Sequence, residues 1–233
     1  MKLEDASVMI TGGSSGIGLG IATMLIERGA KVAICARDES RLSEAAKSVG
    51  ALAIGCDVSD ENAVAAMIET VIEKFGDYNV LINNAGFGTF AKLVDLDMKE
   101  FLGVMETNVF GATIVARESA KHFISNNGGN IVNVASTAAL RGFAGGSAYC
   151  ASKFALTALT ECWRAELRKH NIRVMQINPS EVQTGFAAAG GREQTLSDRK
   201  LRAEEIAHAV VSMLEMDDRG FVTDMTVWAT NPE

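Results

Sequence analysis

A tyrosine and a lysine stand four residues apart in the stretch SAYCASKFALTAL, residues 147–159. Residues i and i+4 share one face of a helix, so a helix over this stretch would hold Lys153 beside Tyr149. A free phenol has a pKa of about 10, which makes it a poor acid–base catalyst at neutral pH. Because a neighbouring cation favours the phenolate, we expect Lys153 to lower the pKa of Tyr149. The pair predicts a general acid–base site; a tyrosine packed in the core is the alternative.

A glycine-rich turn, TGGSSGIG at residues 11–18, lies between an apolar run and a helix-like segment. Gly12, Gly16 and Gly18 permit a tight turn and a close approach of backbone N–H groups to a pyrophosphate, and the helix N-terminus adds positive potential. The spacing G-x-x-x-G-x-G departs from the more common G-x-G-x-x-G pattern. A flexible turn that binds nothing is the alternative interpretation.

Secondary-structure elements must bring these distant residues together. Along the chain, short runs rich in β-branched residues alternate with helical patterns. The expected strands are 7–11, 31–35, 51–56, 79–83, 130–136, 172–178 and 220–228. The expected helices are 17–29, 38–48, 60–75, roughly 97–126, 148–169 and 203–214. This alternation predicts an α/β fold, a doubly wound, Rossmann-like parallel sheet of about seven strands with helices on both faces, as a single domain over 1–233. The irregular stretch 185–200 follows the sixth strand, where we expect a substrate loop.

Composition narrows the class of protein. The 233 residues carry a formal net charge of −7, which argues against binding to nucleic acid or to an anionic membrane. No apolar run approaches the about 20 residues that span a bilayer, and no signal-peptide pattern is found, so we expect a cytoplasmic protein. No metal site or disulfide framework is expected from the cysteines, which are interpreted as small buried hydrophobes: Cys35, Cys56, Cys150 and Cys162. The three histidines have no nucleophile beside them, which disfavours a hydrolase.

Taken together, the glycine loop, NNAG at 83–86, Ser136 and the Tyr149-x-x-x-Lys153 pair resemble the short-chain dehydrogenase/reductase family. The motifs occur in the family's order over nearly the whole chain. The resemblance implies that Tyr149 protonates a carbonyl oxygen, that Lys153 also holds the nicotinamide ribose, and that Ser136 binds the substrate oxygen. Asn108, in ETNVFG, matches the family's fourth catalytic residue, which supports a proton-relay water; otherwise it would be a polar kink in a helix.

The resemblance also implies the contacts of a dinucleotide cofactor. Asp57 and Val58 match the pair that frames the adenine, although Asp57 is equally suited to capping the next helix. Ser180 stands where the family usually has glycine. The other cofactor-binding residues implied are Gly12, Ser14, Ser15, Gly16, Ile17, Gly18, Asn84, Ala85, Gly86, Tyr149, Lys153, Val182 and Thr184.

The end of the second strand bears on the choice between NADP and NAD. Ala36 offers no acceptor for a ribose hydroxyl, and Arg37 follows it with donors suited to a 2′-phosphate. Asp38 is suited to be a helix N-cap, but pointing inward it would favour NAD. We therefore expect NADP(H) to be favoured over NAD(H).

The leading hypothesis for function is an NADPH-dependent reductase of ketones or aldehydes. The alternatives are a 3-oxoacyl-(acyl-carrier-protein) reductase, an NAD-dependent alcohol or polyol dehydrogenase, and a non-catalytic cofactor-sensing protein. The substrate is expected to be a small molecule, in a partly apolar pocket suggested by Phe87, Phe90, Leu140, Phe143 and Phe186.

The resemblance further implies a homo-oligomer, tetramer or dimer, formed through the helices at 97–126 and 148–169. Both helices carry apolar residues beyond one narrow stripe. These residues are Phe101, Val104, Met105, Val109, Phe110, Phe154, Leu156, Leu159 and Trp163.

Overall fold

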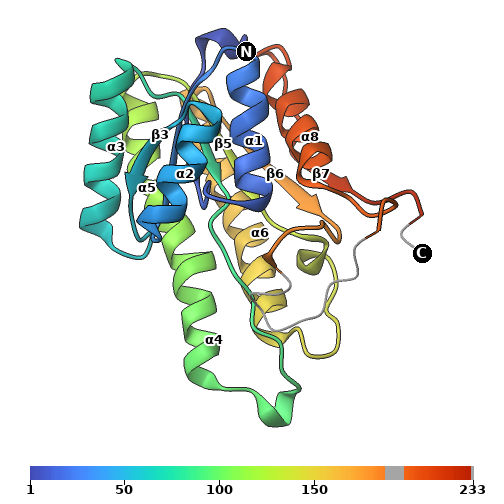
Figure 1. Ribbon diagram of the computed structural model, residues 1–233. Coiled ribbons are helices and arrows are strands. Elements are labelled where there is room, and N and C mark those ends of the chain that lie inside the picture. Colours follow the sequence, from blue (N-terminus) through green and yellow to red (C-terminus); the bar gives the residue numbers. More distant parts are fainter. Residues whose placement is uncertain (187–196, 232–233) are drawn as a thin grey trace.

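The computed structural model describes residues 1–186 and 197–231, and it places one parallel sheet at the centre of the molecule (Figure 1). Seven strands pair in the order β3-β2-β1-β4-β5-β6-β7, each parallel to its neighbour. Their bounds are Ser7–Thr11 (β1), Lys31–Ala36 (β2), Leu52–Gly55 (β3), Val80–Asn83 (β4), Gly129–Val134 (β5), Ile172–Pro179 (β6) and Asp224–Val227 (β7). The predicted doubly wound parallel sheet is confirmed.

Helices cover both faces of this sheet (Figure 1). On one face, α1 (Gly16–Glu27), α2 (Glu39–Val49) and α8 (Ala203–Glu215) enclose an apolar core with the strands. On the other face, α3 (Glu61–Phe75), α5 (Ala112–Ser125) and α6 (Ser147–Leu167) enclose a second core. Strands buried on both faces explain the continuous apolar runs in the sequence, because neither side of such a strand meets water.

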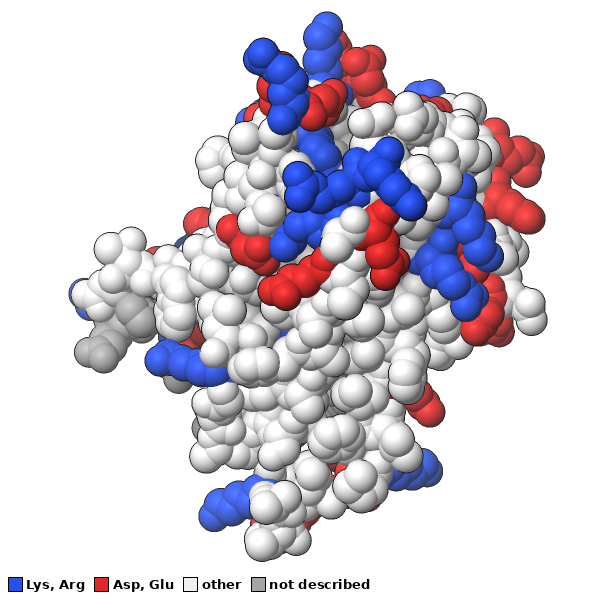
Figure 2. All heavy atoms as spheres, turned by 180° about the vertical axis from the view of Figure 1, so that it is seen from behind, with Lys and Arg blue, Asp and Glu red and all other residues white. Residues whose placement is uncertain are grey.

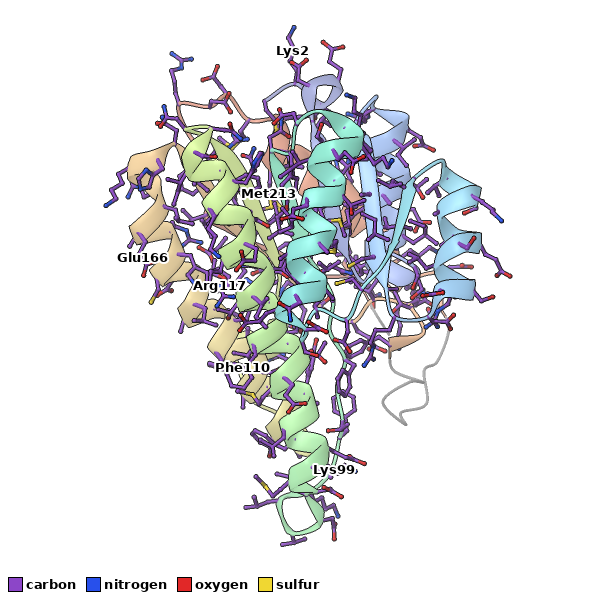
Figure 3. The ribbon with its side chains drawn as sticks, turned by 90° about the vertical axis from the view of Figure 1, so that its left-hand side faces the viewer. Lys2, Lys99, Phe110, Arg117, Glu166 and Met213 are labelled. Atoms are coloured by element: carbon purple, nitrogen blue, oxygen red, sulfur yellow. The ribbon has the colours of Figure 1, made fainter. Side chains whose placement is uncertain are left out.

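The segment predicted as one long helix at 97–126 is interrupted by a wide turn. α4 (Met98–Met105) leads into a π-helical turn, Glu106–Gly111, which continues into α5. The three parts form one rod whose α4 end projects beyond the sheet (Figure 3). π-helical turns are rare and often occur at functional sites. Asn108 lies within this turn, so the polar residue does mark an irregularity in the helix.

The strand order reverses between β1 and β4, and this reversal opens a crevice at the carboxyl edge of the sheet. The loops after both strands meet there. The hydroxyl oxygen of Thr11 accepts hydrogen bonds from the backbone N–H groups of Asn84 at 3.0 Å and Ala85 at 2.9 Å. The side-chain amide of Asn84 donates to the carbonyls of Thr11 and Gly12 in return. The glycine loop and the NNAG loop are therefore held as one unit.

Three other expectations from the sequence concern the cysteines, membrane-spanning segments and the substrate loop. Cys35, Cys56 and Cys150 are buried as predicted, but Cys162 is exposed on the outer face of α6, so its interpretation as a buried residue was wrong. Among the described residues, no helix has both the length and the apolar character needed to cross a bilayer. Residues 187–196 of the predicted substrate loop lie outside the described residues.

Candidate active site

A pocket of about 600 Å³ lies over the carboxyl edge of the sheet, in the crevice beside β1 and β4. It runs from Arg37, after β2, past the glycine loop to Tyr149 on α6. Of the residues singled out from the sequence, the following line it: Gly12, Ser14, Ser15, Gly16, Ile17, Arg37, Asp57, Val58, Asn84, Ala85, Gly86, Ser136, Tyr149, Lys153, Val182 and Thr184. Gly18 and Asn108 lie beside the pocket without lining it.

The glycine loop has a backbone that only glycine adopts readily. Gly12 and Gly16 have φ angles of 65° and 54°, in the left-handed region. A Cβ on Gly12 would lie 2.9 Å from the Cα of Ala85, and a Cβ on Gly18 would lie 2.5 Å from the Gly12 carbonyl oxygen. Gly18 therefore serves the packing of α1 against the loop, which explains its place outside the pocket wall.

The N-terminus of α1 differs from those of the next three helices. Asp38, Asp60 and Asp97 cap α2, α3 and α4, each accepting hydrogen bonds from backbone N–H groups of the first turn. Ser15 holds the equivalent position in α1, and within the described chain its side chain makes no capping hydrogen bond. The first N–H groups of α1 thus remain available to an anion in the pocket. A dinucleotide pyrophosphate fits this cradle of glycines and helix terminus.

At the far end of the pocket, Arg37 lies 3.9 Å from the carboxylate of Asp57. Asp57 accepts hydrogen bonds from the backbone and the hydroxyl of Ser59, and the cap of α3 is Asp60 rather than Asp57. Burial raises the pKa of Asp57, but the Ser59 hydrogen bonds and Arg37 outweigh burial, so its pKa is lowered overall. Asp38 accepts from the Arg41 N–H at 3.0 Å, which makes it the N-cap of α2, as predicted.

Ser136, Tyr149 and Lys153 converge at the other end. Ser136 follows β5, and its hydroxyl accepts the Ala138 N–H at 3.1 Å. Burial raises the pKa of Tyr149 to about 12, partly offset by a hydrogen bond with the Ser136 side chain. Lys153 is buried, and its ammonium group donates to the Val134 carbonyl at 2.9 Å and lies 5.8 Å from the Tyr149 ring centre. Burial lowers the pKa of Lys153 to about 8.

The expectation that Lys153 lowers the pKa of Tyr149 was wrong for this structure. Helical spacing does bring the two side chains together, but both are removed from water, and burial disfavours the charged form of each. Tyr149 is consequently protonated at neutral pH. A protonated phenol beside a hydroxyl is arranged to donate a proton to an oxygen atom placed between them.

Asn108 is linked to the site by hydrogen bonds to the backbone of Phe87 and to the side chain of Ser152 on α6. Its amide oxygen accepts the Phe87 N–H at 3.0 Å, and its nitrogen donates to the Phe87 carbonyl at 2.8 Å and to the Ser152 hydroxyl at 3.0 Å. Ser152 donates in turn to the Tyr149 carbonyl at 2.7 Å. The sequence reasoning missed Ser152, although a polar residue between Tyr149 and Lys153 on an apolar helix was a signal. It also missed pocket-lining residues, among them Cys35, Cys56 and Thr107.

Comparison with known proteins agrees with this geometry. The family model for short chain dehydrogenases matches residues 6–195. The NADP-dependent 3-hydroxy acid dehydrogenase of Schizosaccharomyces pombe is 31% identical over 245 residues, covering 99% of this chain and 95% of the relative. Among solved structures, the 3-ketoacyl-(acyl-carrier-protein) reductase of Brucella melitensis complexed with NADH superposes with a TM-score of 0.87, at 29% identity and 98% coverage of both chains. An alcohol dehydrogenase from Thermococcus sibiricus complexed with 5-hydroxy-NADP gives 0.85 at 27% identity, covering 97% of this chain and 98% of that one.

The chain belongs to the short-chain dehydrogenase/reductase family. It is an oxidoreductase of that family, and the pocket is suited to a nicotinamide dinucleotide. Structural neighbours with NAD-type and NADP-type cofactors both occur, so the family alone does not select between them.

Proposed function

We propose that the protein reduces a ketone or aldehyde to an alcohol with NADPH. The observation that carries the proposal is one pocket with Ser136, Tyr149 and Lys153 at one end and Arg37 at the other, joined by the glycine loop. We further propose that it works in the cytoplasm, supported by four cysteines that are all free thiols.

Each residue of the site has a role in this reaction. NADPH, when bound, supplies a hydride to the carbonyl carbon. The Ser136 hydroxyl holds the carbonyl oxygen, and Tyr149 transfers its proton to that oxygen. The Lys153 ammonium group, held by the Val134 carbonyl, stabilises the phenolate that Tyr149 becomes. Val182 and Thr184 line the pocket together with the glycine loop, and they would hold the carboxamide of the nicotinamide there.

The preference for NADPH is supported by charge at the adenosine end. Arg37 and Arg41 both line the pocket there, and Asp38 is engaged as the cap of α2. A 2′-phosphate would therefore meet two guanidinium groups. The similarity to an NADP-dependent dehydrogenase points the same way.

A 3-oxoacyl-(acyl-carrier-protein) reductase remains the second candidate, because the Brucella melitensis reductase superposes over nearly the whole chain. An NAD-dependent alcohol or polyol dehydrogenase is disfavoured by the two arginines at the adenosine end. A cofactor-sensing protein without catalysis is disfavoured because serine, tyrosine and lysine are all in place.

Replacing each of the two tyrosines of the chain in turn tests the proposal. Tyr149→Phe removes the proton donor and little volume, so carbonyl reduction should fall by about a hundredfold or more, while NADPH binding followed by fluorescence stays nearly unchanged. Tyr78→Phe is the matched control, because the Tyr78 hydroxyl is buried in the second core, where it shares a hydrogen bond of 2.8 Å with the Ser119 hydroxyl and does not line the pocket. It should lose stability but keep turnover. Retention of more than about a tenth of kcat in Tyr149→Phe would contradict the role of Tyr149 as the acid.

A further inference from the structure

We propose that the substrate is an uncharged ketone that carries an aryl or other apolar ring group, and that Phe90, Phe143 and Phe186 select it. The inference rests on the proposed carbonyl reduction and specifies its substrate class. Three kinds of observation support it: the arrangement of the rings, the way in which the backbone holds them, and the distribution of charge in the pocket.

The catalytic phenol is the centre of an aromatic cluster. Phe186 lies 5.3 Å from Tyr149 between ring centres, and Phe90 lies 5.9 Å from it in an edge-on orientation. Phe143 continues the series at 6.1 Å from Phe90 and is 42% exposed. Such separations are typical of favourable aromatic pairs. The cluster thus extends from the proton donor to an exposed ring, with Phe186 in the pocket wall and with Phe90 and Phe143 packed beyond it.

The backbone holds this cluster in place. Phe90 precedes Ala91, whose N–H donates to the Gly145 carbonyl at 3.0 Å and which forms a bridge with Gly146. A Cβ on Gly146 would lie 2.7 Å from the Phe143 ring. These contacts tie the loop of Phe90 to the loop of Phe143.

Gly88 lets three of the rings approach one point. A Cβ on Gly88 would lie 3.1 Å from both the Phe90 and Tyr149 rings and 3.3 Å from the Phe186 ring, so any larger residue would push the rings apart. The three rings therefore pack closely around Gly88, where a side chain would crowd them.

Charge is concentrated at the opposite end of the pocket. Of the charged residues that line its described part, Arg37, Asp38, Arg41 and Asp57 lie at the adenosine end. Lys153 lies near Tyr149 but is buried and bound to the Val134 carbonyl. Arg141, on the loop of Phe143, stacks over the Trp228 ring at 5.5 Å. Apart from Lys153, the described wall of the pocket offers no cation to a carboxylate beside Tyr149, so such a group would lose water at a cost, whereas an apolar ring would gain contacts.

The inference can be tested with two methyl ketones that differ only in the group at the end of their carbon chain. Benzylacetone ends in a phenyl group and levulinate in a carboxylate, on the same linker. With NADPH and wild-type protein, we expect kcat/KM for benzylacetone to exceed that for levulinate by about ten- to a hundredfold, the value of burying one apolar ring. Butanone, small and neutral, should fall between them.

Variants then assign the preference to the rings. Phe143→Leu and Phe90→Leu should each raise KM for benzylacetone about three- to tenfold, a larger increase than either variant causes in KM for butanone. Phe75→Leu is the matched control, because Phe75 ends α3 at the opposite edge of the sheet, where its carbonyl accepts the Lys31 ammonium group. It should change neither ketone's kinetics.

The outcomes separate the two proposals. Turnover that favours levulinate, or that is insensitive to Phe90 and Phe143, overturns the substrate class while carbonyl reduction stands. Absence of turnover with all three ketones and with an acyl-thioester ketone overturns carbonyl reduction, and the substrate class with it.

Discussion

Asn108 donates a hydrogen bond to the hydroxyl of Ser152, 3.0 Å away, and so ties the π-helical turn to the helix of Tyr149 and Lys153. The Ser152 hydroxyl in turn donates a hydrogen bond to the backbone carbonyl of Tyr149. The wide turn therefore helps to set the position of the proton donor, although neither Asn108 nor Ser152 lines the pocket.

Ser152→Ala should lower kcat and cost about 1–2 kcal/mol of unfolding free energy, because it leaves the buried amide of Asn108 with one partner fewer. Urea unfolding and steady-state kinetics measure the two effects. Ser125→Ala is the control: Ser125 makes the same hydrogen bond to a carbonyl three residues back but is exposed at the end of α5. Equal effects of the two substitutions would show that Ser152 serves only its own helix.

The pH dependence of reduction should report Lys153. Burial lowers the pKa of Lys153 to about 8, so its cation is present below this pH and lost above it. Tyr149, with its pKa raised to about 12, keeps its proton over the same range. We expect kcat/KM for reduction to decline above a pH of about 8, because a neutral lysine no longer stabilises the phenolate. Lys153→Met should be slow at every pH without this bend. A bend that persists in Lys153→Met belongs to another group.

Because the N-terminus of α1 is uncapped within the part of the chain that the structure describes, we expect substitution of Ser15 to affect cofactor binding but not the stability of the fold. Ser15→Ala should leave the midpoint of thermal unfolding almost unchanged, since Ser15 makes no capping hydrogen bond in the described chain, but should weaken cofactor binding. Asp60→Ala removes a side chain that accepts hydrogen bonds from two backbone N–H groups of α3. It should lower the free energy of unfolding by about 1 kcal/mol and leave cofactor binding unchanged. Calorimetry of both variants with and without NADPH decides the matter. The reverse pattern would place the pyrophosphate elsewhere.

Arg37 should set the cofactor preference. The wild type is expected to favour NADPH over NADH by about ten- to a hundredfold in kcat/KM, the value of a charge-assisted contact to the 2′-phosphate. Arg37→Ala should remove most of this ratio by weakening NADPH alone. Arg28→Ala, at an exposed ion pair with Glu215, is the control. A wild type that prefers NADH, or a ratio unchanged by Arg37→Ala, would leave Arg37 as a surface charge.

We also predict a homo-oligomer, a tetramer or a dimer, formed through the rod and α6. Leu102 and Phe110 are each 56% exposed, and Phe154 on α6 is 44% exposed. The back face of the molecule is largely uncharged over its lower half (Figure 2), and Phe110 lies on the rod (Figure 3). Light scattering at micromolar concentration should give a molecular mass that is a multiple of the 24.7 kDa of one chain. Phe110→Glu should lower this mass, because it places a charge in the apolar surface. A wild-type monomer would refute the prediction.

Much of the fold could be predicted because burial imposes a pattern on the residues that experience it. The run at 7–11 is β1, and the segment predicted at 60–75 is α3, shorter by one residue at its start. β7 occupies only Asp224–Val227 of the predicted 220–228, because it lies at the sheet's edge, where burial alternates. The π-helical turn leaves no periodic trace, so the rod was expected to be a regular helix.

In the candidate site, too, local sequence predicts some features, whereas others depend on tertiary packing. Spacing along one helix was sufficient to bring Tyr149 and Lys153 together, but the direction of their pKa shifts depends on burial by segments distant in sequence. The bond between Asn108 and Ser152 spans 44 positions and follows from tertiary packing alone. The convergence of three rings on Gly88 is likewise a property of loops whose conformations no local pattern encodes.

The all-parallel sheet has a consequence for how the chain acquires its structure. In the described part of the chain, no two neighbouring strands are joined by a hairpin. At least one helix lies between the two strands of each pair in the sequence, and two further strands lie between β1 and β4. Pairings so distant in sequence carry a large loop-closure entropy, which slows folding. Refolding from denaturant should therefore be slow and pass through species with unpaired strand edges, which associate at high protein concentration. Yield on refolding should accordingly fall as the chain concentration rises.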